Sequence, residues 1–422
     1  MVRSLFVILL AACGARDALD LAEQRGGDAS TSGGAAGPGP STSPSSPASS
    51  GTGGAPAPCT GFVVDGEPYP IPVGQNATEP EVGVAGDGRM FVAWLAQSET
   101  IDGDATIEID AWPHPFQNIS GIVDGPGPFV MGRGSPEPVV LFGDVFGGTS
   151  LAHGIFGTPG AFVHVPNGKP LYAVDIGSRT LYAVDEGGLL NVGSYATPNH
   201  ASHGPYICLG TKMLASATRK GDGVVVAYAD SIAPGQSCFA QTPQPGLSLV
   251  TMRYEIANPG DASFNLIEAA VLPQVEPLLH LELVATSFGA YAVYQTDGST
   301  AVTMPPIQAS LLDHGGELQP EGSGPIALTG SGIATNTIAA TAMDEDVAVA
   351  WVDSIDPSAP TIIVRRLRAD GSVVAETSIP TNAAWLSGKV RMVTSPDQRS
   401  LLLAWTADVN KSVGVAKVMC TP

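Results

Sequence analysis

The stretch Val347-Ala348-Val349-Ala350-Trp351 is an unbroken apolar run that ends on an aromatic residue. A polar turn, Asp-Glu-Asp at residues 344–346, precedes this run, and a second turn, Asp-Ser at residues 353–354, follows it. An apolar run of this length between two turns is typical of a strand that is buried on both faces. The order of turn, buried strand and turn therefore predicts an antiparallel meander.

Four further copies of this unit occur along the chain, and each ends on Trp or Tyr. They are Phe91-Val92-Ala93-Trp94, Val225-Val226-Ala227-Tyr228, Tyr291-Ala292-Val293-Tyr294 and Leu402-Leu403-Ala404-Trp405. The five terminal aromatic residues are 134, 66, 57 and 54 positions apart. Because the first gap is twice the second, we expect one more copy near residue 161, in the strand-like stretch 160–165. The regular place of the aromatic residues predicts that they belong to the core and not to a sugar-binding platform.

Six units of roughly 55–67 residues would fill the chain after residue 58, and each unit has room for four short strands. Repeats built from four strands are typical of propeller blades. The sequence therefore predicts an all-β, β-propeller-like domain over residues 59–422, with two β-sandwich domains or an irregular β protein as the alternatives. A predicted hairpin, formed by the similar segments 171–175 and 181–185, makes the second unit irregular and leaves seven blades open. The pattern resembles the loosely conserved β-propellers of bacterial secreted lipoproteins.

The two ends of this domain predict how its ring closes. The last unit contains only three candidate strands, at residues 389–393, 400–405 and 413–419. The apolar run at residues 61–64 provides a fourth strand for the same blade. Pairing of the N-terminal and C-terminal strands would close the ring and remove exposed strand edges.

The N-terminal residues predict export. One positive charge, at Arg3, precedes an apolar run at residues 5–10, and Leu10-Ala11-Ala12-Cys13 follows. The run is too short to span a bilayer as a helix, which needs about 20 residues. The segment around Cys13 resembles the lipobox of bacterial lipoproteins. This resemblance implies a signal peptide at residues 1–12, a diacylglycerol on Cys13, and an outer-membrane or cell-surface location, because Gly14 is not the Asp of inner-membrane lipoproteins.

Residues 13–58 are predicted to form a tether. From residue 26 onward this segment is almost entirely Gly, Ser, Thr, Ala and Pro, without the apolar periodicity that builds a core. A flexible chain scales as ~5–6 Å × √n, so such a tether would hold a domain tens of ångströms from the membrane.

Four cysteines remain after Cys13 is assigned to lipidation, and an even number in an oxidising compartment predicts two disulfides. Four cysteines allow three pairings. We favour Cys59–Cys420, which lies at the two ends of the domain, together with Cys208–Cys238, which brackets one candidate hairpin.

The net charge of the chain limits the classes of partner that it can bind. It has 40 acidic and 19 basic residues and a formal charge of −21. Nucleic-acid affinity depends on basic groups that displace counterions, so a nucleic-acid partner is excluded. The same charge disfavours contact with an anionic lipid surface. We therefore expect membrane attachment only through the N-terminal lipid, and a protein or polysaccharide as partner.

Two groups of residues are weak metal-site candidates. His200 and His203 form a His-x-x-His pair in a predicted loop, with Cys208 close by; borderline metals use such ligands, but polar loop histidines are the simpler interpretation. Asp102 and Asp104 alternate with other oxygen-bearing side chains, as in calcium loops. The third carboxylate and the glycine of an EF-hand loop are missing, so an acidic hairpin turn is favoured. No metal or other cofactor is assigned.

No catalytic motif stands out. The chain has no Gly-x-Ser-x-Gly nucleophile elbow and no glycine-rich phosphate loop. We therefore expect a non-enzymatic, surface-tethered binding or scaffold lipoprotein, with the loops at residues 143–160 and 196–210 as candidate binding elements. The alternative is an envelope glycan hydrolase or lyase on a propeller scaffold, because the spacing of paired carboxylates in sequence does not reveal their geometry. A mainly structural envelope component is a third hypothesis.

Overall fold

The chain divides into two units, residues 1–56 and 57–422, and all residues described below belong to the second. The computed structural model describes residues 59–71, 76–97, 105–112, 123–124, 129–132, 138–143, 149–153, 169–175, 179–185, 189–196, 200–203, 207–208, 215–220, 223–230, 248–256, 264–273, 278–296, 305–314, 317–318, 325–330, 337–353, 360–381, 389–408 and 412–422.

These residues form seven antiparallel sheets and contain no helix. The described part of the chain therefore has no helix that could span a membrane. The all-β, propeller-like fold expected from the sequence is confirmed. The first three sheets in chain order are β3 (Asn76–Val84), β4 (Met90–Gln97), β5 (Ala105–Trp112) and β6 (Val123–Asp124); β7 (Phe129–Gly132), β8 (Val139–Gly143) and β9 (Thr149–His153); and β10 (Lys169–Asp175), β11 (Arg179–Asp185), β12 (Leu189–Ala196), β13 (His200–His203) and β14 (Ile207–Cys208).

The remaining four sheets follow the same meander. They are β15 (Ala215–Lys220), β16 (Gly223–Asp230), β17 (Ser248–Ile256) and β18 (Phe264–Pro273); β19 (Leu278–Ala285), β20 (Gly289–Thr296), β21 (Gln308–His314), β22 (Glu317–Leu318) and β23 (Ile326–Ala327); β24 (Ile338–Met343), β25 (Asp346–Asp353), β26 (Thr361–Leu367) and β27 (Val373–Pro380); and β28 (Val390–Thr394), β29 (Ser400–Asp408), β30 (Ser412–Thr421), β1 (Gly61–Val64) and β2 (Tyr69–Pro70).

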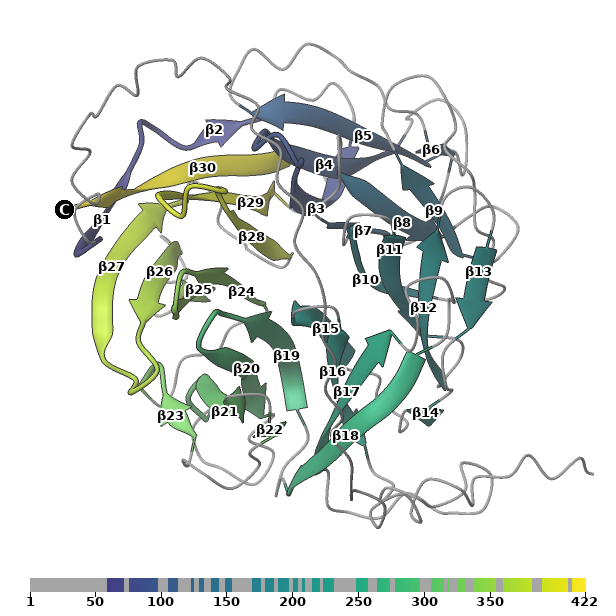
Figure 1. Cartoon of the computed structure of the whole chain (residues 1–422). Helices are drawn as coiled ribbons and strands as arrows, with labels where there is room; N and C mark the ends of the chain where they lie inside the picture. Colours follow the sequence, from purple (N-terminus) through teal and green to yellow (C-terminus); the bar gives the residue numbers. More distant parts are fainter. Residues whose placement is uncertain are drawn as a thin grey trace, which may run out of the picture. The chain divides into compact units, whose positions relative to one another are not determined.

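The seven sheets are arranged around a common centre (Figure 1). The first strand of each sheet contacts the first strand of the next, in the order β3, β7, β10, β15, β19, β24 and β28, and β28 contacts β3. The first strands therefore form the inner wall of the ring.

Each copy of the sequence repeat is the second strand of its sheet: β4, β16, β20, β25 and β29. The aromatic residues that end four of these copies, Trp94, Tyr294, Trp351 and Trp405, are buried. The expectation that they form core and not a sugar platform is correct for these four positions. The regular spacing of the repeat thus reflects one buried strand in each sheet.

The expected sixth copy near residue 161 lies outside the described residues. The gap of 134 residues between Trp94 and Tyr228 instead contains two complete second strands, β8 and β11, each with a buried aromatic residue, Phe142 or Tyr182. The described residues thus form seven sheets, whereas the spacing of the repeat predicts six units and leaves seven open. The segments 171–175 and 181–185 pair as the predicted hairpin, β10 with β11.

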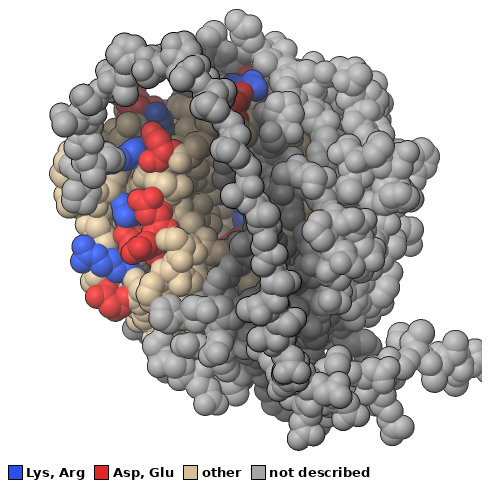
Figure 2. All heavy atoms as spheres, viewed as in Figure 1, with Lys and Arg blue, Asp and Glu red and all other residues tan. Residues whose placement is uncertain are grey.

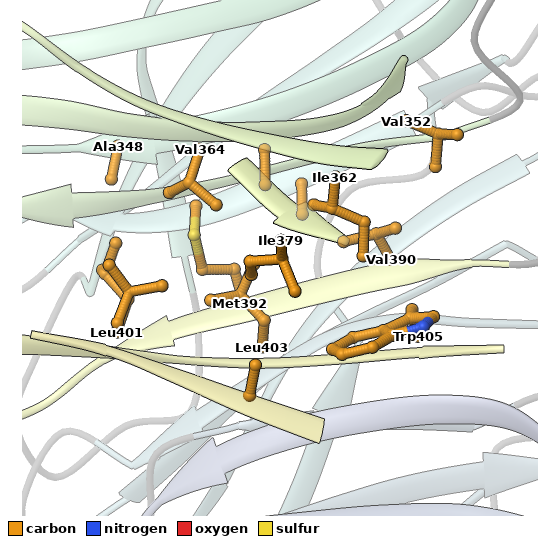
Figure 3. Close-up of a cluster of buried hydrophobic side chains, with 14 of the residues drawn as sticks. Ala348, Val352, Ile362, Val364, Ile379, Val390, Met392, Leu401, Leu403 and Trp405 are labelled. Atoms are coloured by element: carbon orange, nitrogen blue, oxygen red, sulfur yellow. The ribbon is translucent and has the colours of Figure 1, made fainter. Parts of the chain in front are cut away.

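Neighbouring sheets pack through apolar side chains. Between the β24–β27 sheet and the β28–β30 sheet, Ile362 and Val364 lie against Leu401, Leu403 and Trp405 (Figure 3). The Trp405 ring lies across its register partner on β30, Gly414, where an added Cβ would stand 2.4 Å from the ring. Glycine at this position therefore allows the indole to lie across β30 within the same sheet.

The ring closes as the sequence predicts. β1 pairs antiparallel with β30, with Phe62 opposite Cys420, so the start of the domain completes its last sheet. Cys59 and Cys420 form a disulfide with a Cα–Cα distance of 5.4 Å. Cys238 lies outside the described residues, so the Cys208–Cys238 pairing stays a prediction.

Removal of the disulfide should destabilise the domain, because the bond joins residues 361 positions apart and restricts the unfolded chain. We expect the double variant Cys59→Ser, Cys420→Ser to lose about 2–4 kcal/mol of unfolding free energy, the usual range for a native disulfide. Urea denaturation of the oxidised wild type and the variant measures this difference. Equal midpoints would show that β1 is held by strand pairing alone.

Candidate functional site in the central channel

A cavity of about 560 Å³ lies at the centre of the ring, and all seven first strands line it. A cavity of this size is comparable with ligand pockets in other proteins. Its polar and charged lining residues are Glu81, Lys169, Tyr172, Ser216, Thr218, His280, Glu282, Thr337, Thr341, Lys389 and Arg391.

Side-chain contacts show that neighbouring first strands run in the same direction. At the start of β28 the Val390 N–H donates to Thr337 Oγ1, just before β24, at 3.2 Å. At the end of β28 the Thr394 hydroxyl donates to the carbonyl oxygen of Ala342, near the end of β24, at 2.5 Å. The starts of β24 and β28 therefore lie side by side, and so do their ends.

The charge gathers where β28 begins. Lys389 directly precedes this strand and Arg391 is its second residue. The lining residues near the ends of the first strands are small or apolar, as with Ala285, Ala342 and Val393. The channel thus has a charged end, on the side of Lys389 and Arg391, and an apolar end, where the first strands pass into the turns before the second strands.

Arg391 connects three sheets at the charged end. Its Nε donates to Glu81 Oε1 on β3 at 2.9 Å, and its Nη1 donates to Glu282 Oε1 on β19 at 3.1 Å. Strand β24 lies between β19 and β28 and lines the wall with Ala340 and other short side chains. These short side chains leave room for the guanidinium to reach Glu282.

Lys389 completes the cluster. Its Nζ forms an ion pair with Glu79 and lies 3.8 Å from Glu81 Oε1. We call Glu79, Glu81, Glu282, Lys389 and Arg391 the charged cluster. It contains three carboxylates and two cations, so it carries one excess negative charge when every member is ionised.

Burial and charge act against each other within the cluster. The Glu81 side chain is 6% exposed, whereas those of Arg391 and Glu282 are 24% and 28% exposed. Burial raises the pKa of Glu282, and the Arg391 guanidinium opposes this effect. Burial alone would lower the pKa of Arg391, but the carboxylates of Glu81 and Glu282 outweigh it and raise that pKa. Arg391 therefore remains a cation.

Charges on the outer surface have a different arrangement. On the described part of the face in Figure 2, acidic and basic side chains lie next to one another. Ion pairs outside the channel include Arg365 with Glu376 at 2.6 Å and Arg366 with Asp346 at 2.7 Å. These pairs join strands of one sheet, whereas the charged cluster joins three different sheets.

None of the metal-site candidates from the sequence is among the described residues that line the channel. His200 and His203 lie in β13 and not in the predicted loop, because residues 200–203 pair with β12; their side chains are outside what the structure describes. Asp102 and Asp104 lie outside the described residues. Within the described ranges no group of three or more His, Cys, Asp or Glu residues is placed to hold a metal ion.

One member of the predicted calcium-loop pattern is described, and it has another role. Glu108 lies in β5, and its Oε2 accepts a hydrogen bond from Trp94 Nε1 at 3.0 Å. The carboxylate therefore anchors the buried indole across the β4–β5 pair. Strands β4 and β5 pair antiparallel, and residues 98–104 between them lie outside the described residues.

Sequence reasoning missed the charged cluster. The signal that could have found part of it is a spacing of two: His280 and Glu282 on β19, and Lys389 and Arg391 at β28. Positions two apart on a strand share one face of the sheet. Paired charges within otherwise apolar strands therefore indicate a polar surface inside the ring.

No protein-family model matches the sequence, and comparison with curated proteins finds no match. Several solved structures are similar in chain trace. They include the WD40 repeats of RRP9 (10% identity, 86% of this chain and 99% of that chain, TM-score 0.49), a protein of unknown function from Dyadobacter fermentans (11%, 86% and 99%, 0.46) and BamB from Moraxella catarrhalis (9%, 85% and 97%, 0.41). Similarity at these levels carries no information on function.

Arg391→Met should destabilise the ring, because it leaves Glu81 and Glu282 in the channel without their shared cation. Loss of one partner of a largely buried ion pair costs on the order of 3 kcal/mol. Chemical denaturation measures the loss. Arg89→Met is the matched control, because it removes an ion pair with Asp87 in which both side chains are about half exposed (47% and 48%). Equal effects of the two substitutions would contradict a structural role for the cluster.

Proposed function

We propose that this protein is a lipid-anchored envelope protein whose propeller-like domain binds a protein partner at the charged end of its channel. The observation that carries the proposal is the position of Cys59. The Cys420 N–H donates to the carbonyl oxygen of Arg399, in the turn that follows β28, at 2.9 Å. The Cys59–Cys420 disulfide therefore lies at the outer strands of the last sheet, on the side of the ring where the first strands finish.

This position gives the two ends of the channel different surroundings. The chain enters the domain at the apolar end, so a tether from Cys13 would attach there. The charged end would then face away from the attachment point and remain open to a partner. Acyl chains on Cys13 would provide stable membrane attachment without any contact between the acidic domain and lipid headgroups.

The geometry favours binding over glycan hydrolysis. Hydrolysis of a glycosidic bond usually needs two carboxylates that both reach the substrate. Glu81 and Glu282 are the channel carboxylates, but Glu81 is buried and already paired with Arg391 and Lys389. A channel wall whose charges are largely paired with one another suits recognition of a docked group better than acid–base chemistry.

The anchor is tested by intact-mass measurement of the protein purified from its native membrane. We expect a mature chain that begins at Cys13 and carries the added mass of a diacylglycerol, and a Cys13→Ala variant that lacks this mass. A wild-type protein without lipid would overturn the anchor and make the domain freely secreted or uncut.

The binding face is tested by photo-crosslinking in intact cells. A photoreactive residue at position 169, exposed at the start of β10, reports on the charged end. The matched control is position 373, which is also exposed. It lies at the start of β27, on the side of its sheet where the first strand, β24, ends. We expect a discrete crosslinked protein from position 169 only. Equal crosslinking from both positions, or none, would contradict a partner at the charged end.

A further inference from the structure

The carboxylates of the charged cluster are neutralised unequally. Glu81 receives both cations, Lys389 and Arg391, and Glu79 receives Lys389. Glu282 has only a share of Arg391, whose guanidinium also binds Glu81. Because Glu79 shares Lys389 with Glu81 as Glu282 shares Arg391 with Glu81, the excess negative charge of the cluster is divided between Glu79 and Glu282.

Glu282 is also the cluster carboxylate that a ligand in the cavity could reach. It lines the channel and is 28% exposed, whereas Glu81 is 6% exposed and Glu79 is not part of the lining. Burial raises the pKa of Glu282, which means that its ionised form is costly in the free protein. A cation placed beside it would offset that cost.

The wall around Glu282 suits a long basic side chain. Ala340 and Ala342 on the neighbouring strand β24 line the channel and are partly exposed, whereas the side chains of Leu281, Leu283 and Ile338 are buried in the core between sheets. Lysine and arginine side chains have an apolar stem and a charged head, and the stem packs favourably on apolar surface. A cavity of about 560 Å³ has room for one such side chain.

We infer that Glu282 receives the guanidinium or ammonium group of an arginine or lysine that a protein partner inserts into the charged end of the channel. This inference rests on the proposed function and specifies the chemistry of the partner. The formal charge of −21 would attract a basic segment before contact.

The test uses two peptides of nearly the same shape, acetyl-Gly-Arg-Gly-amide and its citrulline counterpart, in which the guanidinium is replaced by a neutral urea. Calorimetric titration of the full chain should show about tenfold tighter binding of the arginine peptide, because a partly desolvated ion pair is lost with citrulline. Glu282→Gln should remove this preference. Glu376→Gln, at a surface carboxylate paired with Arg365 outside the channel, should retain it.

A second variant keeps the test informative if Glu282→Gln fails to fold. Ala340→Arg places a cation on the neighbouring channel wall while Glu282 stays in place. This internal guanidinium should occupy the carboxylate and abolish binding of the arginine peptide. Unchanged binding in this variant would overturn the assignment of the site.

The outcomes separate this inference from the proposed function. Equal affinity for the two peptides, or a preference that survives Glu282→Gln, overturns the cation site, whereas a crosslinked protein at position 169 would still support a protein partner. Deacetylated chitotriose, an amino sugar, is the third probe. If it binds through Glu282 more tightly than the arginine peptide does, the cation site stands but the partner is a polysaccharide, which overturns the inference of a protein side chain.

Discussion

The pairing of β1 with β30 is the contact on which the arrangement of the domain depends. The sheet that ends the chain has only three strands from the C-terminal residues, and β1 adds the fourth across a separation of more than 350 residues. This pairing covers an edge that would otherwise be open to other chains. It also fixes the last sheet beside the first, because β2 pairs with β30 and is followed in the chain by β3. The disulfide at Cys59 fastens this junction covalently.

The channel and its charges are a consequence of the same closure. Arg391 is 310 residues from Glu81 and 109 residues from Glu282, and it meets both only because β28 lies between β24 and β3 in the closed ring. Hydrophobic packing between sheets supplies most of the cohesion, as in the cluster that holds Ile362, Leu403 and Trp405, but it is not specific for one end of the channel. The ion pairs of Arg391 give the charged end a defined geometry that apolar packing alone would not.

The fold was accessible from the sequence because it depends on local patterns that repeat. The stretch Val347-Ala348-Val349-Ala350-Trp351 and its copies mark second strands, and the three-strand C-terminal unit indicates the need for β1. The number of sheets was less accessible, because β8 and β11 lack the Ala/Val-aromatic ending that marks the other second strands. The charged cluster was missed because the pairing of Arg391 with Glu81 and Glu282 depends on which strands meet around the ring, and no local pattern encodes those partners.

An excess carboxylate inside a protein needs a reason, because burial of unpaired charge destabilises the folded state. Outside the channel, ion pairs join strands of one sheet, as in Arg365 with Glu376 and Arg366 with Asp346. In the charged cluster three carboxylates share two cations, and Glu282 is the partly exposed carboxylate that lines the cavity, whose lining also includes Lys169. A mismatch confined to the accessible end of a channel is what a recognition site requires, since a fully neutralised cluster would have no charge left with which to select a partner.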